Sequence, residues 1–148
     1  MKIIVNDANI LIDLIELQNL PYFFKLEIEF RTTTLILDEL FQEQQQELLP
    51  YIETGKLTPD DISEHDMEEI VAIRSFRPTL SEQDCSAFFL ARKEKAALIT
   101  SDNTLRKFAK SQNMEVHGHF RILDKLYDAG IFSSVCATEK LNYNRPPF

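Results

Sequence analysis

The stretch that decides the fold is Lys2–Leu17, KIIVNDANILIDLIEL. Lys2–Asn6 is a short apolar run of the kind that forms a buried strand. Ala8–Leu17 carries apolar residues at helical spacing. Asp7 occupies the junction, so the sequence predicts a strand that leads into a helix through one acidic residue.

The same order recurs near the end of the chain. Ala97–Thr100 is typical of a buried strand, Asp102 follows it, and Asn103–Ser111 is typical of a helix. The other expected helices are Leu20–Leu26, Leu35–Leu49, Ser63–Phe76, Ser81–Lys95 and Phe120–Ala129, and the other expected strands are Ile28–Thr33, Lys56–Leu57 and Glu115–His117. Alternating strands and helices predict an α/β fold with a mainly parallel central sheet and helices on both faces.

Length and composition indicate one domain covering residues 1–148. No apolar run is long enough to span a membrane, and no cleavage site of a signal peptide follows the first apolar run. Cys85 and Cys136 are the only cysteines, which favours two free thiols in a reducing compartment and hence the cytoplasm. The net charge of −8 argues against a dedicated nucleic-acid binder, although a metal bound among carboxylates would reverse the local sign.

Four acidic residues are candidates for a functional site, and each has a plain structural alternative. Asp7 and Asp102 sit where helix N-caps are expected, and Asp is a preferred cap. Both also follow strands, and open α/β sheets bind ligands at the carboxyl ends of their strands. Asp84 completes a Ser81–Asp84 capping box. Glu39 lies beside apolar residues in an expected helix and is otherwise an ordinary solvated acid.

The case for function is the combination of the four. Converging carboxylates repel one another and hold protons unless a cation is present. Their oxygens suit Mg²⁺ or Mn²⁺, and such ions activate water and orient phosphodiesters. We therefore predict a catalytic set of Asp7, Glu39, Asp84 and Asp102, with Asp7, Asp84 and Asp102 as metal ligands.

At these residues the sequence resembles the PIN-domain family of metal-dependent ribonucleases, in particular its compact toxin-like, VapC-type members. The family's opening motif is matched by Asp7-Ala8-Asn9, its Glu-Leu pair by Glu39-Leu40, its third acid by Asp84 in LSEQDCSAFFLAR, and its fourth by Thr100-Ser101-Asp102. The resemblance extends roughly from Lys2 to Phe132.

The resemblance implies a three-layer α/β/α domain and an endoribonuclease that hydrolyses phosphodiester bonds in RNA with Mg²⁺ or Mn²⁺. It also implies the toxin of a toxin–antitoxin pair, a homodimer, and a small antitoxin protein as partner. Neighbouring side chains are expected to hydrogen-bond the carboxylates or contact substrate: Asn9, Thr100, Ser101 and Arg106. For each of them an ordinary helix-terminal or surface role is the alternative.

Two other function classes stay open from the sequence. One is a catalytically silent PIN-like module that binds RNA or protein, which the acidic balance favours. The other is a phosphorylation receiver or phosphatase, which would need a second acid near Asp7. Positions 6 and 9 are both Asn, so the second class is disfavoured.

Overall fold

The computed structural model describes residues 3–118. Its elements follow one another in the predicted alternation. They are β1 (Ile3–Asn6), α1 (Ala8–Glu16), α2 (Leu20–Phe23), β2 (Glu29–Thr33), α3 (Thr34–Glu39), α4 (Gln42–Glu53), β3 (Leu57–Asp60), α5 (Glu64–Phe76), α6 (Glu82–Lys93), β4 (Ala97–Ile99), α7 (Asn103–Ser111) and β5 (Val116–His117). The expected helix Phe120–Ala129 and Cys136 lie outside the described residues.

The strands form one five-stranded sheet in the order β3-β2-β1-β4-β5. Every pair of neighbouring strands in this described part of the chain is parallel, which confirms the predicted parallel sheet. β1 is central, with Ile4 and Val5 fully buried on opposite faces. Pro59 lies in β3, at an edge of this sheet, where a missing N–H donor is tolerated.

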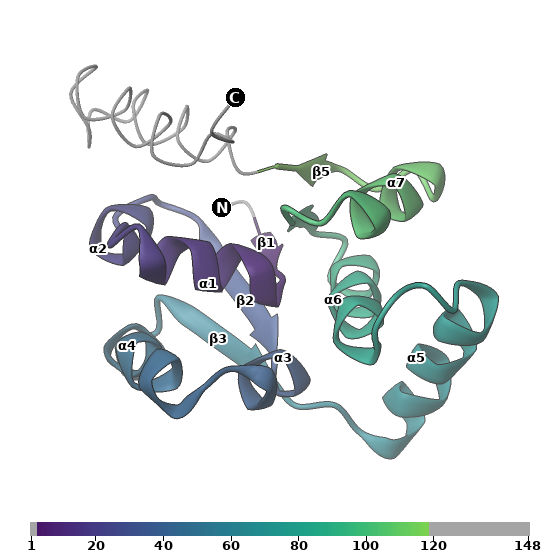
Figure 1. Ribbon diagram of the computed structural model, residues 1–148, viewed down its shortest axis with the longest axis horizontal. Helices are drawn as coiled ribbons and strands as arrows, with labels where there is room; N and C mark the ends of the chain where they lie inside the picture. Colours follow the sequence, from purple (N-terminus) through teal and green to yellow (C-terminus); the bar gives the residue numbers. More distant parts are fainter. Residues whose placement is uncertain (1–2, 119–148) are drawn as a thin grey trace.

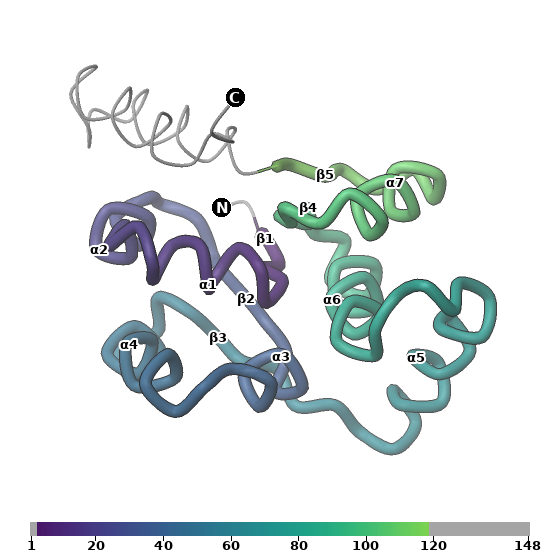
Figure 2. The backbone as a smooth tube through the Cα atoms, viewed as in Figure 1, coloured from purple at the N-terminus to yellow at the C-terminus, as the bar shows by residue number. Residues whose placement is uncertain are grey.

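The helices form two layers. From β1 the chain moves outward through β2 to β3, and α1 to α4 pack together on one side of the strands (Figure 1). It then crosses to β4 on the other side of β1, and α6 packs against β1, β2 and β4 with α5 and α7 beside it. Figure 2 shows this path, with β4 lying between β1 and β5. The three-layer α/β/α architecture is therefore as expected, and its parallel crossovers follow the usual connection rules.

The predicted helix Leu35–Leu49 is wrong as a single element, because the chain breaks into α3 and α4 at Leu40 and Phe41. Both residues are extended, and Leu40 is buried while Phe41 is exposed. The glutamine-rich segment stabilises the break. Gln44 accepts a hydrogen bond from the Phe41 N–H at 2.9 Å, and Gln45 donates to the Leu40 carbonyl at 2.9 Å. Side chains that bond to the backbone in this way compete with a continuous helix.

Two further sequence expectations can be compared with the fold. Cys85 is buried, and burial raises the pKa of its thiol to about 11, so it is an unreactive core residue. Across residues 3–118, every helix is too short or too polar to cross a membrane.

Candidate active site

The four acids lie around the point where the strand order reverses. In the order β3-β2-β1-β4-β5 this point is between β1 and β4, which pair in parallel. Asp7 follows β1 and Asp102 follows β4, so both are at carboxyl ends of neighbouring strands. Open α/β sheets bind ligands at such a switch point.

Asp7 is a buried carboxylate at the centre of this site. It is 1% exposed and caps α1, with Oδ1 accepting the Ile10 N–H at 2.9 Å. Its Oδ2 accepts a short hydrogen bond from the Thr100 hydroxyl. Burial raises the pKa of Asp7 to about 7, against the opposing effect of these two hydrogen bonds. The negative charges of Asp84 and Asp102 add to the increase, which shows that the three acids lie close enough to interact.

Thr100 joins the ends of the two central strands. Its hydroxyl donates to Asp7 and accepts the Asp102 N–H at 3.0 Å, and its side chain is fully buried. Asp102 in turn caps α7, with Oδ2 accepting the Leu105 N–H at 2.8 Å. The Oδ1 atom of Asp102 has no hydrogen-bond partner among residues 3–118. One carboxylate oxygen is therefore available at the end of β4.

Asp84 is best understood by comparison with Asp66, because both close a Ser capping box. The Asp84 carboxylate accepts the Ser81 N–H at 3.1 Å, and the Asp66 carboxylate accepts the Ser63 N–H at 3.2 Å. The hydrogen bond from the Ser63 backbone lowers the pKa of Asp66. Burial raises the pKa of Asp84, and the charge of Asp102 raises it further, despite the hydrogen bonds from Ser81. The same motif therefore shifts the two pKa values in opposite directions, first because Asp84 is more deeply buried than Asp66, and then because Asp84 lies near Asp102.

Glu39 is the outermost of the four. It is the last residue of α3, and its side chain is exposed. Partial burial raises its pKa, and the charge of Asp84 raises it further. α3 and α6 are in contact, so Glu39 approaches the cluster from the α1–α4 layer. The structure thus brings all four predicted acids into one electrostatically connected group.

The donor set fits a hard divalent cation that keeps part of its water shell. Within the described residues, no three acidic, His or Cys side chains are close enough to form a preformed metal cage. Mg²⁺ needs only one or two carboxylates and retains several waters. The negative charges of neighbouring acids raise the pKa values of Asp7 and Asp84, and a bound cation would offset this repulsion. Asp7, Asp84 and Asp102 are the residues that would hold the cation, one or two of them directly and the others through its bound waters.

Of the other predicted residues, the side chain of Thr100 hydrogen-bonds the carboxylate of an acid and those of the rest do not, among residues 3–118. Thr100 contacts Asp7 directly. Asn9 and Ser101 are exposed and make no hydrogen bond to an acid among residues 3–118. Arg106 lies over the backbone of Gly118, with Nη1 2.5 Å from where a Cβ at that position would sit. The absence of a side chain at Gly118 therefore leaves room for the Arg106 guanidinium beside the end of β5.

The sequence interpretation missed Thr33 and Ser86. Thr33 ends β2, caps α3 through the Ile36 N–H, and is fully buried. Its hydroxyl lies 2.8 Å from that of Ser86, which is also fully buried, on α6. This contact holds the helix of Asp84 against the carboxyl end of β2. The rule that singled out Asp7, a polar residue between a strand and a helix, also fits Thr33 and would have found it.

Thr100→Val tests the support of Asp7. The change keeps the shape of the side chain but removes the donor to Asp7, so the pKa of Asp7 should rise further above its usual range. It also leaves the Asp102 N–H without its acceptor, which costs about 1–3 kcal/mol of stability. Carboxyl ¹³C NMR titration and thermal denaturation measure the two effects.

Thr32→Val is the matched control for that change. Thr32 is also fully buried, and its hydroxyl donates to the Asn6 carbonyl at 3.0 Å. It should lose stability while the pKa of Asp7 stays where it is. An unchanged Asp7 pKa in Thr100→Val would show that the hydroxyl does not tune the acid.

Comparison with known proteins agrees with this architecture. A comparison with curated protein sequences finds no match. Solved structures with a similar fold include VapBC2 from Rickettsia felis bound to a DNA fragment from its promoter, with 21% identity, 78% of this chain and 98% of that chain covered, and a TM-score of 0.55. PAE2754 from Pyrobaculum aerophilum has 15% identity, coverage of 86% and 98%, and a TM-score of 0.59. A toxin–antitoxin complex from Klebsiella pneumoniae has 22% identity, coverage of 66% and 85%, and a TM-score of 0.51.

The family match covers more of the chain than each of these three structures does. The family model DUF3368, described as a PIN domain, matches residues 3–141. The match includes all four acids and nearly the whole chain. The chain therefore belongs to the PIN-domain family.

Proposed function

We propose that this protein is a divalent-metal-dependent endoribonuclease that acts in the cytoplasm as the toxin of a toxin–antitoxin pair. The observation that carries the proposal is Asp7, a buried acid whose pKa is raised to about 7 beside Asp84 and Asp102 at the sheet's switch point. An uncompensated carboxylate in such a place is unfavourable, and a cation would make it favourable. Family membership supports a nuclease, and the VapBC2 and Klebsiella structures, both of toxin–antitoxin systems, support an antitoxin partner.

Each residue has a distinct task in this proposal. Asp7, Asp84 and Asp102 would bind Mg²⁺ or Mn²⁺, and Glu39 would accept a proton at the open side of the cluster. A bound ion of this kind supplies an activated water and stabilises the leaving oxygen of a phosphodiester. Thr100 fixes the orientation of Asp7, and Thr33 with Ser86 fixes the helix that carries Asp84. A homodimer would be the assembly that an antitoxin binds.

Metal removal tests the activity directly. Purified protein should cut single-stranded RNA with Mn²⁺ or Mg²⁺, stop in excess EDTA, and cut again when Mn²⁺ is restored. Fragments are resolved by denaturing electrophoresis, with single-stranded DNA of the same sequence as a parallel substrate. Cutting that persists in EDTA would contradict the metal requirement. No cutting, together with no Mn²⁺ binding by calorimetry, would favour the silent binding module.

A further inference from the structure

A small pocket lies next to the acids, between the α5–α6 loop and one face of α7. Its volume is about 280 Å³. The loop contributes Arg77, Thr79 and Leu80, and α7 contributes Thr104, Lys107, Phe108 and Ser111. The α7 residues are spaced by three or four positions, so they share one face of the helix.

One end of the pocket lies at the N-termini of α6 and α7, the helices whose first turns involve Asp84 and Asp102. Leu80 immediately precedes Ser81, which caps the helix of Asp84, and Thr104 is in the first turn of the helix that Asp102 caps. From Thr104 to Ser111 the helix rises about 10 Å. The pocket therefore leads away from the acids along α7.

The pocket carries positive charge that the described residues do not neutralise. Arg77 and Lys107 have no carboxylate within ion-pair distance among residues 3–118, in contrast to Arg31 and Arg92, which do. Other cations of the described residues, such as Arg74 and Lys95, also have no ion pair, so what distinguishes Arg77 and Lys107 is that both line one pocket. The hydroxyls of Thr79 and Thr104 are exposed and make no hydrogen bond to another described residue. Two cations and two free hydroxyls suit an anionic ligand with several oxygens.

The apolar floor of the pocket is a buried ring that leaves little area on which a base could stack. Phe108 is 7% exposed, its ring packs 4.8 Å from that of Phe88, and the Arg77 guanidinium lies 5.8 Å from its centroid. Neither face of the ring is open to a base. The second ring contact of Arg77, 5.1 Å to the centroid of Phe76, fixes the guanidinium at the pocket edge. The cations and hydroxyls of the pocket therefore favour a phosphate over a base.

We infer that the pocket formed by Arg77, Thr79, Thr104 and Lys107 binds a backbone phosphate of the RNA strand beside the acids, independently of base identity. This inference rests on the proposed nuclease function for its substrate. It also explains how a protein of net charge −8 could bind RNA, because the two cations of the pocket would offset the repulsion where the strand enters.

The test is equilibrium binding of a short, fluorescein-labelled, single-stranded oligouridylate, measured by anisotropy in EDTA so that no cutting occurs. Arg77→Gln and Lys107→Gln should each weaken binding about five- to tenfold at low salt. Each should also reduce the slope of log Kd against log salt by roughly 0.7. Arg77→Lys, which keeps the charge, should retain most of the affinity. Circular dichroism confirms that each variant folds.

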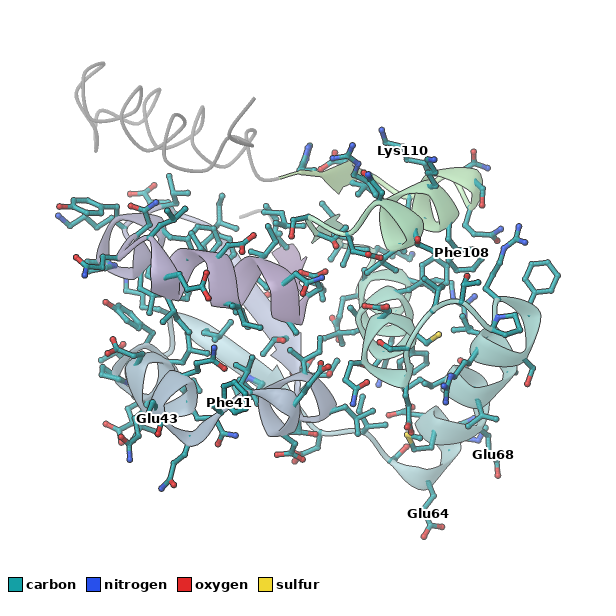
Figure 3. The ribbon with its side chains drawn as sticks, in the orientation of Figure 1. Phe41, Glu43, Glu64, Glu68, Phe108 and Lys110 are labelled. Atoms are coloured by element: carbon teal, nitrogen blue, oxygen red, sulfur yellow. The ribbon has the colours of Figure 1, made fainter. Side chains whose placement is uncertain are left out.

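Lys110 is the matched control, because it is on the same helix but points away from α6, whereas Phe108 points towards it (Figure 3). Lys110→Gln should change affinity less than twofold, by roughly 0.4 kcal/mol. Equal effects at Lys107 and Lys110, or no binding by the wild type, would overturn the inference. If the wild type cuts RNA with Mn²⁺ while Arg77→Gln and Lys107→Gln bind like Lys110→Gln, only the pocket is wrong. If binding depends on the pocket but Mn²⁺ supports no cutting, the pocket stands and the enzyme proposal fails.

Discussion

Asp84→Asn is expected to lower Mn²⁺-dependent RNA cleavage by about a hundredfold, because even the loss of a partner outside the ligand shell costs about 10–100-fold in metal affinity or activity. The variant keeps the capping box, because an Asn side-chain oxygen also accepts the Ser81 N–H. It removes only the charge that interacts with Asp7, Glu39 and Asp102. Initial cleavage rates at saturating Mn²⁺ and calorimetric Mn²⁺ affinity measure the loss.

Asp66→Asn separates this effect from helix capping. Asp66 has the same hydrogen bonds to its own serine, Ser63, but it does not interact with the four acids. Its variant should cleave RNA at the wild-type rate. If both variants lose activity equally, or neither does, Asp84 is a capping residue and the proposed ligand set is wrong.

Asp7→Asn is expected to change the pH dependence of folding without metal. The pKa of Asp7 is about 7 in the folded protein and 3.8 as the ordinary value, so between these values the folded state binds the proton that the unfolded state has released. Stability is therefore greatest at the low end and falls as pH rises. The wild type should lose about 2 kcal/mol from this group between pH 5 and pH 7. Asn does not titrate, so the variant should not lose this stability. The unfolding free energy of the variant minus that of the wild type should therefore increase by about 2 kcal/mol from pH 5 to pH 7.

Denaturant titrations at the two pH values measure this shift, and Mn²⁺ provides the second readout. Metal at about 100 times its Kd should stabilise the wild type by about 2.7 kcal/mol, and the variant much less. Without metal, Asp7→Asn would then gain stability relative to the wild type as pH rises from 5 to 7, and it would be the poorer metal binder. A pH-independent difference between the two proteins would show that Asp7 is already ionised in the folded state, and would remove the main support for the metal proposal.

The fold was largely predictable because its pattern is local. Apolar runs such as that in β1 and β4, followed at once by an acid and a helix, identify strand ends without tertiary information. The break at Leu40 was not predictable from periodicity, because it depends on the Gln44 side chain accepting the Phe41 N–H and the Gln45 side chain donating to the Leu40 carbonyl. Such bonds involve residues whose polarity alone is compatible with a continuous helix.

The candidate site was predictable only as a set of positions. The sequence indicates that Asp7 and Asp102 follow strands, but the burial that raises the pKa of Asp7 results from packing around it. The pairing of Thr33 with Ser86 joins residues 53 positions apart, and no spacing rule reaches that far. The pocket beside α7 likewise needs the α5–α6 loop to fold back against it.

The crossover from β3 to α5 divides the acids in a way that affects synthesis. Asp7 and Glu39 precede it, whereas Asp84 and Asp102 follow it. Chains emerge from the ribosome with their N-terminal portion first. A nascent chain that has passed β3 but has not yet reached α5 holds only Asp7 and Glu39, and it lacks the loop and helix that form the pocket. If the proposed function is correct, the site is therefore completed only when the second half of the chain has been made.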